Sequence, residues 1–253
     1  MFPRPGAAFL NILLLAGFIP IFPQTAAAEK DFPFSLADDV RGMSETAPLL
    51  VLGWGAVTSA TATILENPDG HRGFMGGGGF LHRASVTCDH AMGLPLLGAS
   101  VLTWCAGALA NDAETEESGM MLSEGLLLTY GTVGILKTAV GRERPDGSNN
   151  RSFPSAHAAG TACVAAILWN RYGKAAGIPA SAIAAFTAAS RVHLGRHFPS
   201  DVIAGSSLGL AVGLAVAATR DGDAAPAALP SLGLAWNSHN GFHVYSAYEK
   251  QAR

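Results

Sequence analysis

Three short clusters of charged and polar residues interrupt the apolar sequence between residues 137 and 201: KTAVGRERP (137–145), PSAH (154–157) and SRVHLGRHFPSD (190–201). Seven residues stand out in the three clusters, namely the cations Lys137, Arg144 and Arg191, the histidines His157 and His197, the hydroxyl of Ser155 and the carboxylate of Asp201. Cations are unfavourable in apolar surroundings unless an anion compensates them. The pattern therefore predicts that these residues bind an anion together, and we interpret that anion as a phosphate.

Apolar segments with the length of helices surround the clusters. We expect six helices, at about residues 49–65, 94–110, 120–140, 155–172, 178–191 and 201–218. Several approach the roughly 20 residues that cross a bilayer. Gly205, Gly209 and Gly213 lie four apart on the last segment, a spacing that favours close helix packing. Each cluster falls at a helix end, so antiparallel packing of neighbouring helices would bring all three clusters to one end of a bundle.

The remaining segments divide the chain into three parts. Residues 1–28 have a basic start, a short apolar core and small residues up to Ala28, as in an export signal, with an uncleaved anchor helix as the alternative. Residues 29–220 form the expected helical domain, beginning with a polar lead-in (29–46) and including a glycine-rich loop (70–90). Residues 221–253 are expected to form a linker and a small hairpin.

The composition limits the class of protein. Hydrophobic residues make up 49% of the 253 residues and charged residues only 14%, whereas soluble domains usually have about a quarter charged. The net charge of -3 gives no basic surface, so no nucleic-acid partner is expected. The three cysteines show no metal-ligand spacing and are interpreted as packing residues. The composition favours an all-α bundle embedded in a membrane, with a soluble, alanine-rich bundle as the alternative.

The residue types in the clusters suit phosphate chemistry. Arg144 and Arg191 offer planar forks that match phosphate oxygens, and a helix that begins near Ser155 offers free N–H groups. No group of carboxylates accompanies these cations in the sequence, so we expect neither a metal nor another cofactor. Without a metal, either His157 or His197 can attack phosphorus while the other moves protons. Asp201 can orient the ring of His197 or cap the last helix.

In order and spacing, the clusters resemble the three signature motifs of the type 2 phosphatidic acid phosphatase superfamily, which includes bacterial class A acid phosphatases and vanadium haloperoxidases. The resemblance implies that the phosphate is held by Lys137, Arg144, Ser155, Ala156 through its N–H, and Arg191. It further implies that His157 is the general acid, His197 the nucleophile and Asp201 its orienting partner. The family usually has glycine where Ala156 stands. We expect a negative φ there, which accommodates the extra methyl group.

By that resemblance, the chain is a metal-independent phosphomonoesterase that acts on a lipid phosphate through a phosphohistidine. Phosphatidate, phosphatidylglycerol phosphate, a polyprenyl pyrophosphate and a lipid A phosphate are the candidate substrates. A soluble periplasmic acid phosphatase of broad specificity is the alternative. A vanadate-dependent haloperoxidase is less favoured because such enzymes are usually longer.

Charges in the connections predict a location. Arg171 and Lys174 lie between the fourth and fifth expected helices, and the positive-inside rule assigns such a connection to the cytoplasm. The three clusters would then face the periplasm from the inner membrane. If all six helices cross the membrane, counting the crossings backward from this connection places the start of the first helix in the cytoplasm. A cleaved export signal would instead leave the start of the first helix on the periplasmic side. Either the first segment does not cross, the signal is retained, or the bundle is soluble.

Overall fold

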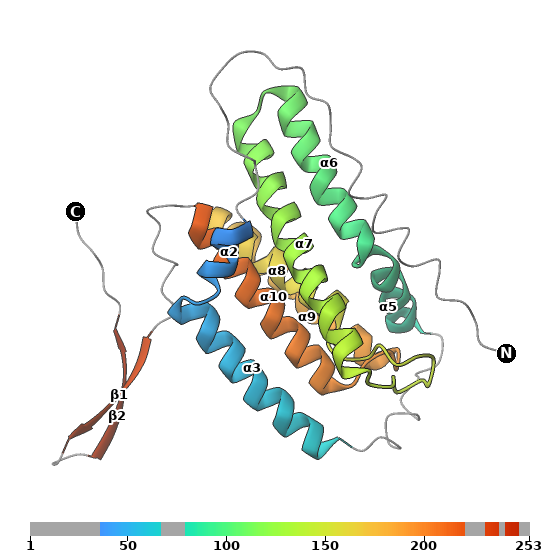
Figure 1. Cartoon of the computed structure of the whole chain (residues 1–253), viewed down its shortest axis with the longest axis vertical. Coiled ribbons are helices and arrows are strands. Elements are labelled where there is room, and N and C mark those ends of the chain that lie inside the picture. Colours follow the sequence, from blue (N-terminus) through green and yellow to red (C-terminus); the bar gives the residue numbers. More distant parts are fainter. Residues whose placement is uncertain (1–35, 67–78, 221–230, 238–240, 248–253) are drawn as a thin grey trace. The chain divides into compact units, whose positions relative to one another are not determined.

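The computed structural model describes residues 36–66, 79–220, 231–237 and 241–247. Within these ranges the helices are α2 (Leu36–Gly42), α3 (Thr46–Leu65), α5 (Phe80–Ala91), α6 (Leu94–Ala110), α7 (Ala113–Val140), α8 (Ala156–Tyr172), α9 (Lys174–His193) and α10 (Pro199–Arg220) (Figure 1). The all-α prediction is confirmed, because each of the six expected helices is present as α3, α6, α7, α8, α9 or α10.

Two helices lie where the sequence suggested none. The prediction of a loop over residues 70–90 is wrong for α5, and α2 lies within the predicted lead-in. Helix α5 has the sequence FLHRASVTCDHA, which is too short and polar to be detected as an apolar run. It buries Ser85 and Cys88, three residues apart on one face, and it packs against α9.

The ends of α7 explain how the chain enters the first cluster. At the start, the Asp112 side chain accepts hydrogen bonds from the N–H groups of Glu114 and Thr115, so the acidic segment begins the helix earlier than predicted. At the end, Gly141 caps the helix with a φ of 60°, a conformation that glycine adopts without strain. The connection 141–155 then leads from Lys137 in the last turn of α7 to the start of α8.

Helices α8 and α10 form the centre of the bundle. Helix α10 also packs on α2, α3, α7 and α9, while α8 packs on α7 and α9 (Figure 1). A Cβ at Gly205, Gly209 or Gly213 would overlap the backbone of Ser155, Ala159 or Cys163, respectively. This confirms the close-packing role of the three glycines. Because the residue numbers increase in the same direction along both helices at these contacts, α8 and α10 run parallel, and their N-termini lie at the same end.

The hydrophobic core lies around this pair of helices. Its buried members come from α7, α8 and α10: Met121, Val133, Ala159, Cys163, Ile167, Leu208, Val212, Val216 and Ala217. Many of these side chains are small, so tight backbone approach rather than side-chain bulk fills the interior.

The outer helices present large apolar side chains to the surroundings. Trp54 on α3 is 70% exposed and Leu109 on α6 is 85% exposed. By length and composition, α3, α7, α9 and α10 could each cross a membrane, and the pair α5–α6, bent by 55°, could form one more broken span. These features indicate a membrane protein.

The C-terminal part contains two antiparallel strands, β1 (Ser231–Asn237) and β2 (Gly241–Ala247), in which Leu234 pairs with Val244. The strands fall within residues 221–253, where the sequence suggested a hairpin. The predicted signal at residues 1–28 lies outside the described residues.

Candidate active site

The helix directions bring the three clusters to one end of the bundle. Lys137 lies in the last turn of α7 and Arg191 in the last turn of α9. Ser155 is the N-cap of α8, and Asp201 lies in the first turn of α10. The Ser155 N–H donates to the Asp201 backbone oxygen at 2.9 Å, which links the second cluster directly to the third.

His197 lies in the short connection between α9 and α10 and is only 2% exposed. Burial lowers the pKa of its imidazole to about 4; the nearby Asp201 carboxylate opposes the shift, while the charges of Lys137, Arg144 and Arg191 add to it. His197 is therefore neutral at neutral pH, which leaves one ring nitrogen with a free lone pair. The same three cations are those that the sequence predicted to hold phosphate.

The carboxylate of Asp201 is fully buried and has several partners. Its Oδ1 accepts a hydrogen bond from Arg142 Nη1 at 2.8 Å. Its Oδ2 accepts from Ser152 Oγ at 2.5 Å and from the Phe198 N–H at 2.9 Å. The distance from Oδ2 to His197 Nδ1 is 3.8 Å, so the contact with the imidazole is electrostatic rather than a hydrogen bond.

Arg142 is a residue that the sequence analysis did not single out. Its guanidinium donates to Glu66 Oε2 at 2.7 Å and to Ser200 Oγ at 2.6 Å, in addition to Asp201. It also lies over the Phe198 ring, 4.1 Å from the centroid. The only local signal was its place beside Arg144 in the GRERP segment. Arg142 thereby ties the end of α3 to the start of α10.

The start of α8 supplies donors for an anion. Ser155 is fully buried, and its Oγ has no hydrogen-bond partner among the residues that the structure describes. Ala156 is the first residue of α8 and is not among the described residues with positive φ, so its methyl group causes no backbone strain. The first turn of α8 also has N–H groups that no intrahelical acceptor satisfies.

The three cations differ in their present contacts. Lys137 Nζ donates to the backbone oxygens of Arg151 and Ser152, at 2.6 and 3.3 Å, and so holds the connection that follows α7. Burial and the charge of Arg191 lower the pKa of Arg144. Within the described ranges, Nε of Arg144 and Nε of Arg191 are buried without a hydrogen-bond partner.

A second carboxylate lies at the site, on the helix that the sequence analysis missed. Asp89 of α5 pairs with Arg191, Oδ1 to Nη1, at 2.5 Å. The ring of His157 lies beside it, with Nε2 at 3.0 Å from the Asp89 backbone oxygen and 3.4 Å from Oδ1. A single acidic residue in an expected loop carried no signal of this role.

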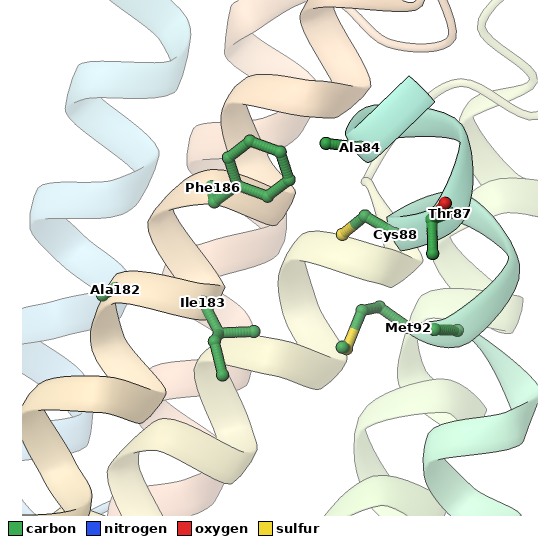
Figure 2. Close-up of a pocket in the computed structure, with 8 residues that line it drawn as sticks. Ala84, Thr87, Cys88, Met92, Ala182, Ile183 and Phe186 are labelled. Atoms are coloured by element: carbon green, nitrogen blue, oxygen red, sulfur yellow. The ribbon is translucent and has the colours of Figure 1, made fainter. Parts of the chain in front are cut away.

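An apolar hollow of about 530 Å³ lies between α5 and α9. Figure 2 shows Cys88 of α5, and Met92 just after the end of α5, facing Ile183 and Phe186 of α9. The full lining consists of Ala84, Thr87, Cys88, Ala91, Met92, Ala182, Ile183 and Phe186. Because Cys88 precedes Asp89 and Phe186 lies just over one turn before Arg191, the hollow adjoins the charged end of the bundle.

Three comparisons relate the chain to known proteins. The model of the PAP2 superfamily matches residues 118–223, which include all three clusters. A lipid A 1-phosphatase of Porphyromonas gingivalis is 35% identical over 99 residues, which are 37% of this chain and 22% of that protein. A decaprenylphosphoryl-5-phosphoribose phosphatase of Mycobacterium tuberculosis is 32% identical over 140 residues, or 50% of this chain and 76% of that protein.

The crystal structure of a transmembrane PAP2-type phosphatidylglycerolphosphate phosphatase from Bacillus subtilis aligns with a TM-score of 0.46 and 23% identity, over 75% of this chain and 94% of that chain. This chain spans about a fifth of the lipid A 1-phosphatase and three quarters of the mycobacterial protein. Since the family model covers every cluster, and a curated relative is matched at 32% identity over most of its length, the chain belongs to the PAP2 superfamily.

Proposed function

We propose that the chain hydrolyses the phosphomonoester of a lipid, without a metal, through a phosphohistidine on His197. The observation that carries the proposal is the buried, neutral His197, whose pKa is lowered in part by the charges of Lys137, Arg144 and Arg191. A neutral imidazole is a nucleophile, and cations around it attract the anion that it attacks. His157 also lies near Arg144 and Arg191, but its side chain is 22% exposed, whereas that of His197 is 2% exposed and lies beside the fully buried Asp201.

Binding of the phosphate uses donors that lack protein partners. Ser155 Oγ, Arg144 Nε and Arg191 Nε are buried and unpaired within the described residues. Buried donors of this kind are unfavourable unless an acceptor reaches them. Phosphate oxygens are strong acceptors, and the N–H groups at the start of α8 add further donors.

The chemistry follows from the two histidines. His197 Nδ1 faces Asp201, so Nε2 attacks phosphorus and forms the N–P bond. The bond between phosphorus and the lipid oxygen breaks, and His157 gives its proton to that oxygen, which leaves as an alcohol. The neutral His157 then accepts a proton from water, which attacks phosphorus, breaks the N–P bond and releases inorganic phosphate. Asp201 stabilises the positive charge that His197 acquires in the first step.

The lipid class is supported by the apolar surroundings of the site. The hollow between α5 and α9 can accept a hydrocarbon chain while the phosphate reaches the cations. The two curated relatives are named for lipid-linked substrates, a lipid A phosphate and a decaprenyl-linked phosphoribose phosphate. A lipid in the bilayer could reach this side of the bundle without leaving the membrane.

The proposed location is the inner membrane, with the charged end facing the periplasm and residues 1–28 directing export. Arg171 and Lys174, at the opposite end of α8 and α9, support this orientation through the positive-inside rule. A cysteine at Ser148, in the connection before α8, is the test in a variant that lacks native cysteines. A membrane-impermeant thiol reagent added to spheroplasts should label Ser148→Cys and spare Lys174→Cys. The reverse labelling would refute the orientation.

A phosphate-release panel tests the function. Purified enzyme should hydrolyse phosphatidate, phosphatidylglycerol phosphate, polyprenyl pyrophosphate or lipid A phosphate at least about tenfold better, by kcat/KM, than glycerol phosphate. A preference for the soluble ester would support a broad-specificity acid phosphatase instead. EDTA should leave the rate unchanged, and loss of activity on chelation would contradict the metal-free chemistry.

Removal of the nucleophile tests the intermediate. His197→Ala should lower kcat by about 1,000-fold or more, while His90→Ala, on the exposed side of α5, serves as the control. Wild-type enzyme quenched with labelled substrate should yield an acid-labile phosphoenzyme that His197→Ala lacks. A phosphoenzyme of unchanged amount in His197→Ala would assign the nucleophile elsewhere.

A further inference from the structure

We infer that Asp89 of α5 is a positioning residue for proton transfer, holding His157 in the orientation and charge state that protonate the leaving lipid oxygen. This inference rests on the proposed phosphatase function and adds a residue outside the three clusters. Asp89 lies far from them in sequence, and α5 carries it to the charged end of the bundle.

The contacts of Asp89 join two residues of the site. Its Oδ1 lies 2.5 Å from Arg191 Nη1 and 3.4 Å from His157 Nε2. Its backbone oxygen lies 3.0 Å from the same His157 nitrogen. One residue thus contacts a proposed phosphate-holding cation and the proposed acid, through both its backbone and its side chain.

The backbone contact sets the proton positions on His157. A carbonyl oxygen only accepts, so Nε2–H must donate to the Asp89 oxygen. In the imidazolium, the transferable proton then lies on Nδ1. When the P–O bond of the substrate breaks, this proton moves to the leaving oxygen, and His157 remains neutral with its Nε2–H still on Asp89. The same Nδ1 next accepts a proton from the attacking water.

The carboxylate sets the charge of His157. Arg191 of α9 and Arg144 of the 141–155 connection both lie near enough to disfavour a protonated ring, and burial acts in the same direction. Asp89, on α5, faces the ring with the opposite charge. A nearby carboxylate stabilises an imidazolium. Burial and the two arginines still lower the pKa of His157 against this opposition, so removing the carboxylate would lower the pKa further and leave less of the protonated ring that the leaving oxygen needs.

The backbone that carries Asp89 is itself fixed against the ring. A Cβ at Gly93, in the bend between α5 and α6, would lie 3.1 Å from His157 Nε2. The Tyr130 hydroxyl of α7 donates to the Gly93 oxygen at 3.1 Å. The bend therefore approaches His157 closely, and α7 helps to hold the bend in place.

Asp89→Asn tests the inference, because it removes the charge and keeps the size of the side chain and the backbone oxygen. The two substrates are a short-chain phosphatidate, whose alkoxide needs a proton to leave, and p-nitrophenyl phosphate, whose phenolate does not. The lost ion pair with Arg191 acts on both substrates alike, so we expect kcat/KM for phosphatidate to fall about tenfold more than kcat/KM for p-nitrophenyl phosphate. Retained turnover of the second substrate also shows that the variant is folded.

A double-mutant cycle with His157→Ala identifies the route of the effect. His157→Ala should show the same selective loss, and adding Asp89→Asn to it should change the ratio of the two kcat/KM values less than about twofold. Equal losses on both substrates in Asp89→Asn would overturn the inference, as would a selective loss that persists without His157. A wild-type enzyme inactive on both esters would refute the proposed function itself.

Discussion

The two sides of the charged end are built differently. On the side of α8 and α10, three glycines bring the backbones into contact, and the Asp201 carboxylate is fully buried among Arg142, Ser152 and the Phe198 N–H. On the side of α5 and α9, the Asp89 side chain is 25% exposed and the two helices, although they pack together, leave an apolar hollow between them. The first side is closely packed and polar; the second is open and apolar.

This difference matches the demands of the proposed reaction, an in-line displacement of a lipid oxygen at phosphorus. The nucleophile must meet phosphorus in one geometry, so it benefits from a rigid support. The leaving group carries the lipid, whose bulk needs space and an apolar path. His197 and Asp201 lie on the packed side, whereas His157 contacts the open side through Asp89. The comparison predicts that substitutions on the packed side impair folding and those on the open side alter substrate choice.

The largest effect on stability is expected for Arg142→Gln. The change leaves the buried Asp201 and Glu66 carboxylates without their cation, which destabilises the fold by about 3 kcal/mol and lowers Tm by roughly 10 °C. Thermal unfolding in detergent measures the shift. Arg41→Gln is the matched control, since Arg41 is 80% exposed in its pair with Asp38 and its loss should leave Tm unchanged. Equal shifts in both variants would contradict the comparison.

Gly209→Ala is expected to have the next largest effect. A methyl group there overlaps the Ala159 carbonyl, so α8 and α10 must separate, at a cost of about 2 kcal/mol or roughly 6 °C in Tm. Gly134→Ala on α7 is the control, because a Cβ at Gly134 meets nothing within 4 Å. It should keep or slightly raise Tm, since alanine favours a helix. If Gly209→Ala is as stable as the control, the backbone contact is not the support that we describe.

On the open side, Ile183→Asn should change substrate choice rather than stability. The amide reduces the apolar lining of the hollow, so kcat/KM should fall about tenfold for a long-chain lipid phosphate and change little for a short-chain one. Ile135→Asn on α7, which is also exposed to the surroundings, is the control. An equal fall in kcat/KM for the long-chain and the short-chain substrate would show that the hollow does not bind the lipid chain.

The smallest expected effect is a shift in the pKa of His197, which lies on the packed side. Burial lowers the pKa of His197 to about 4, so the neutral form that the proposed reaction needs persists until the pH falls to that value. Labelled-histidine NMR should show a ring that titrates near pH 4 and that is missing in His197→Ala. A His197 ring that titrates near its ordinary pKa of about 6.5 would mean that the ring is not buried on the packed side.

The sequence was informative where function and fold leave a local pattern. Six helices could be predicted because each is a long apolar run, and Gly205, Gly209 and Gly213 identified the close contact from their spacing. The motif residues could be assigned to helix ends for the same reason. Their catalytic roles remain predictions.

The sequence was uninformative where the fold joins distant segments. Helix α5 is short and polar, and glycines precede it, so it resembled a loop. Asp89 and Glu66 are single acidic residues whose partners, Arg191 and Arg142, lie far away in the chain. An ion pair of this kind forms only because the helices pack together, so no local spacing in the sequence predicts it.

The way α5 is attached allows the preference for lipid chain length to change without a change in the chemical step. Helix α5 packs on α9 and meets α6 at the 55° bend, and neither α5 nor the bend contributes a residue to the network of Arg142 and Asp201. Replacing residues 80–88 with the matching helix of a relative should therefore transfer its preference for chain length and leave the chemical step intact. Substitutions confined to α5 could in the same way change which lipids the protein accepts during evolution.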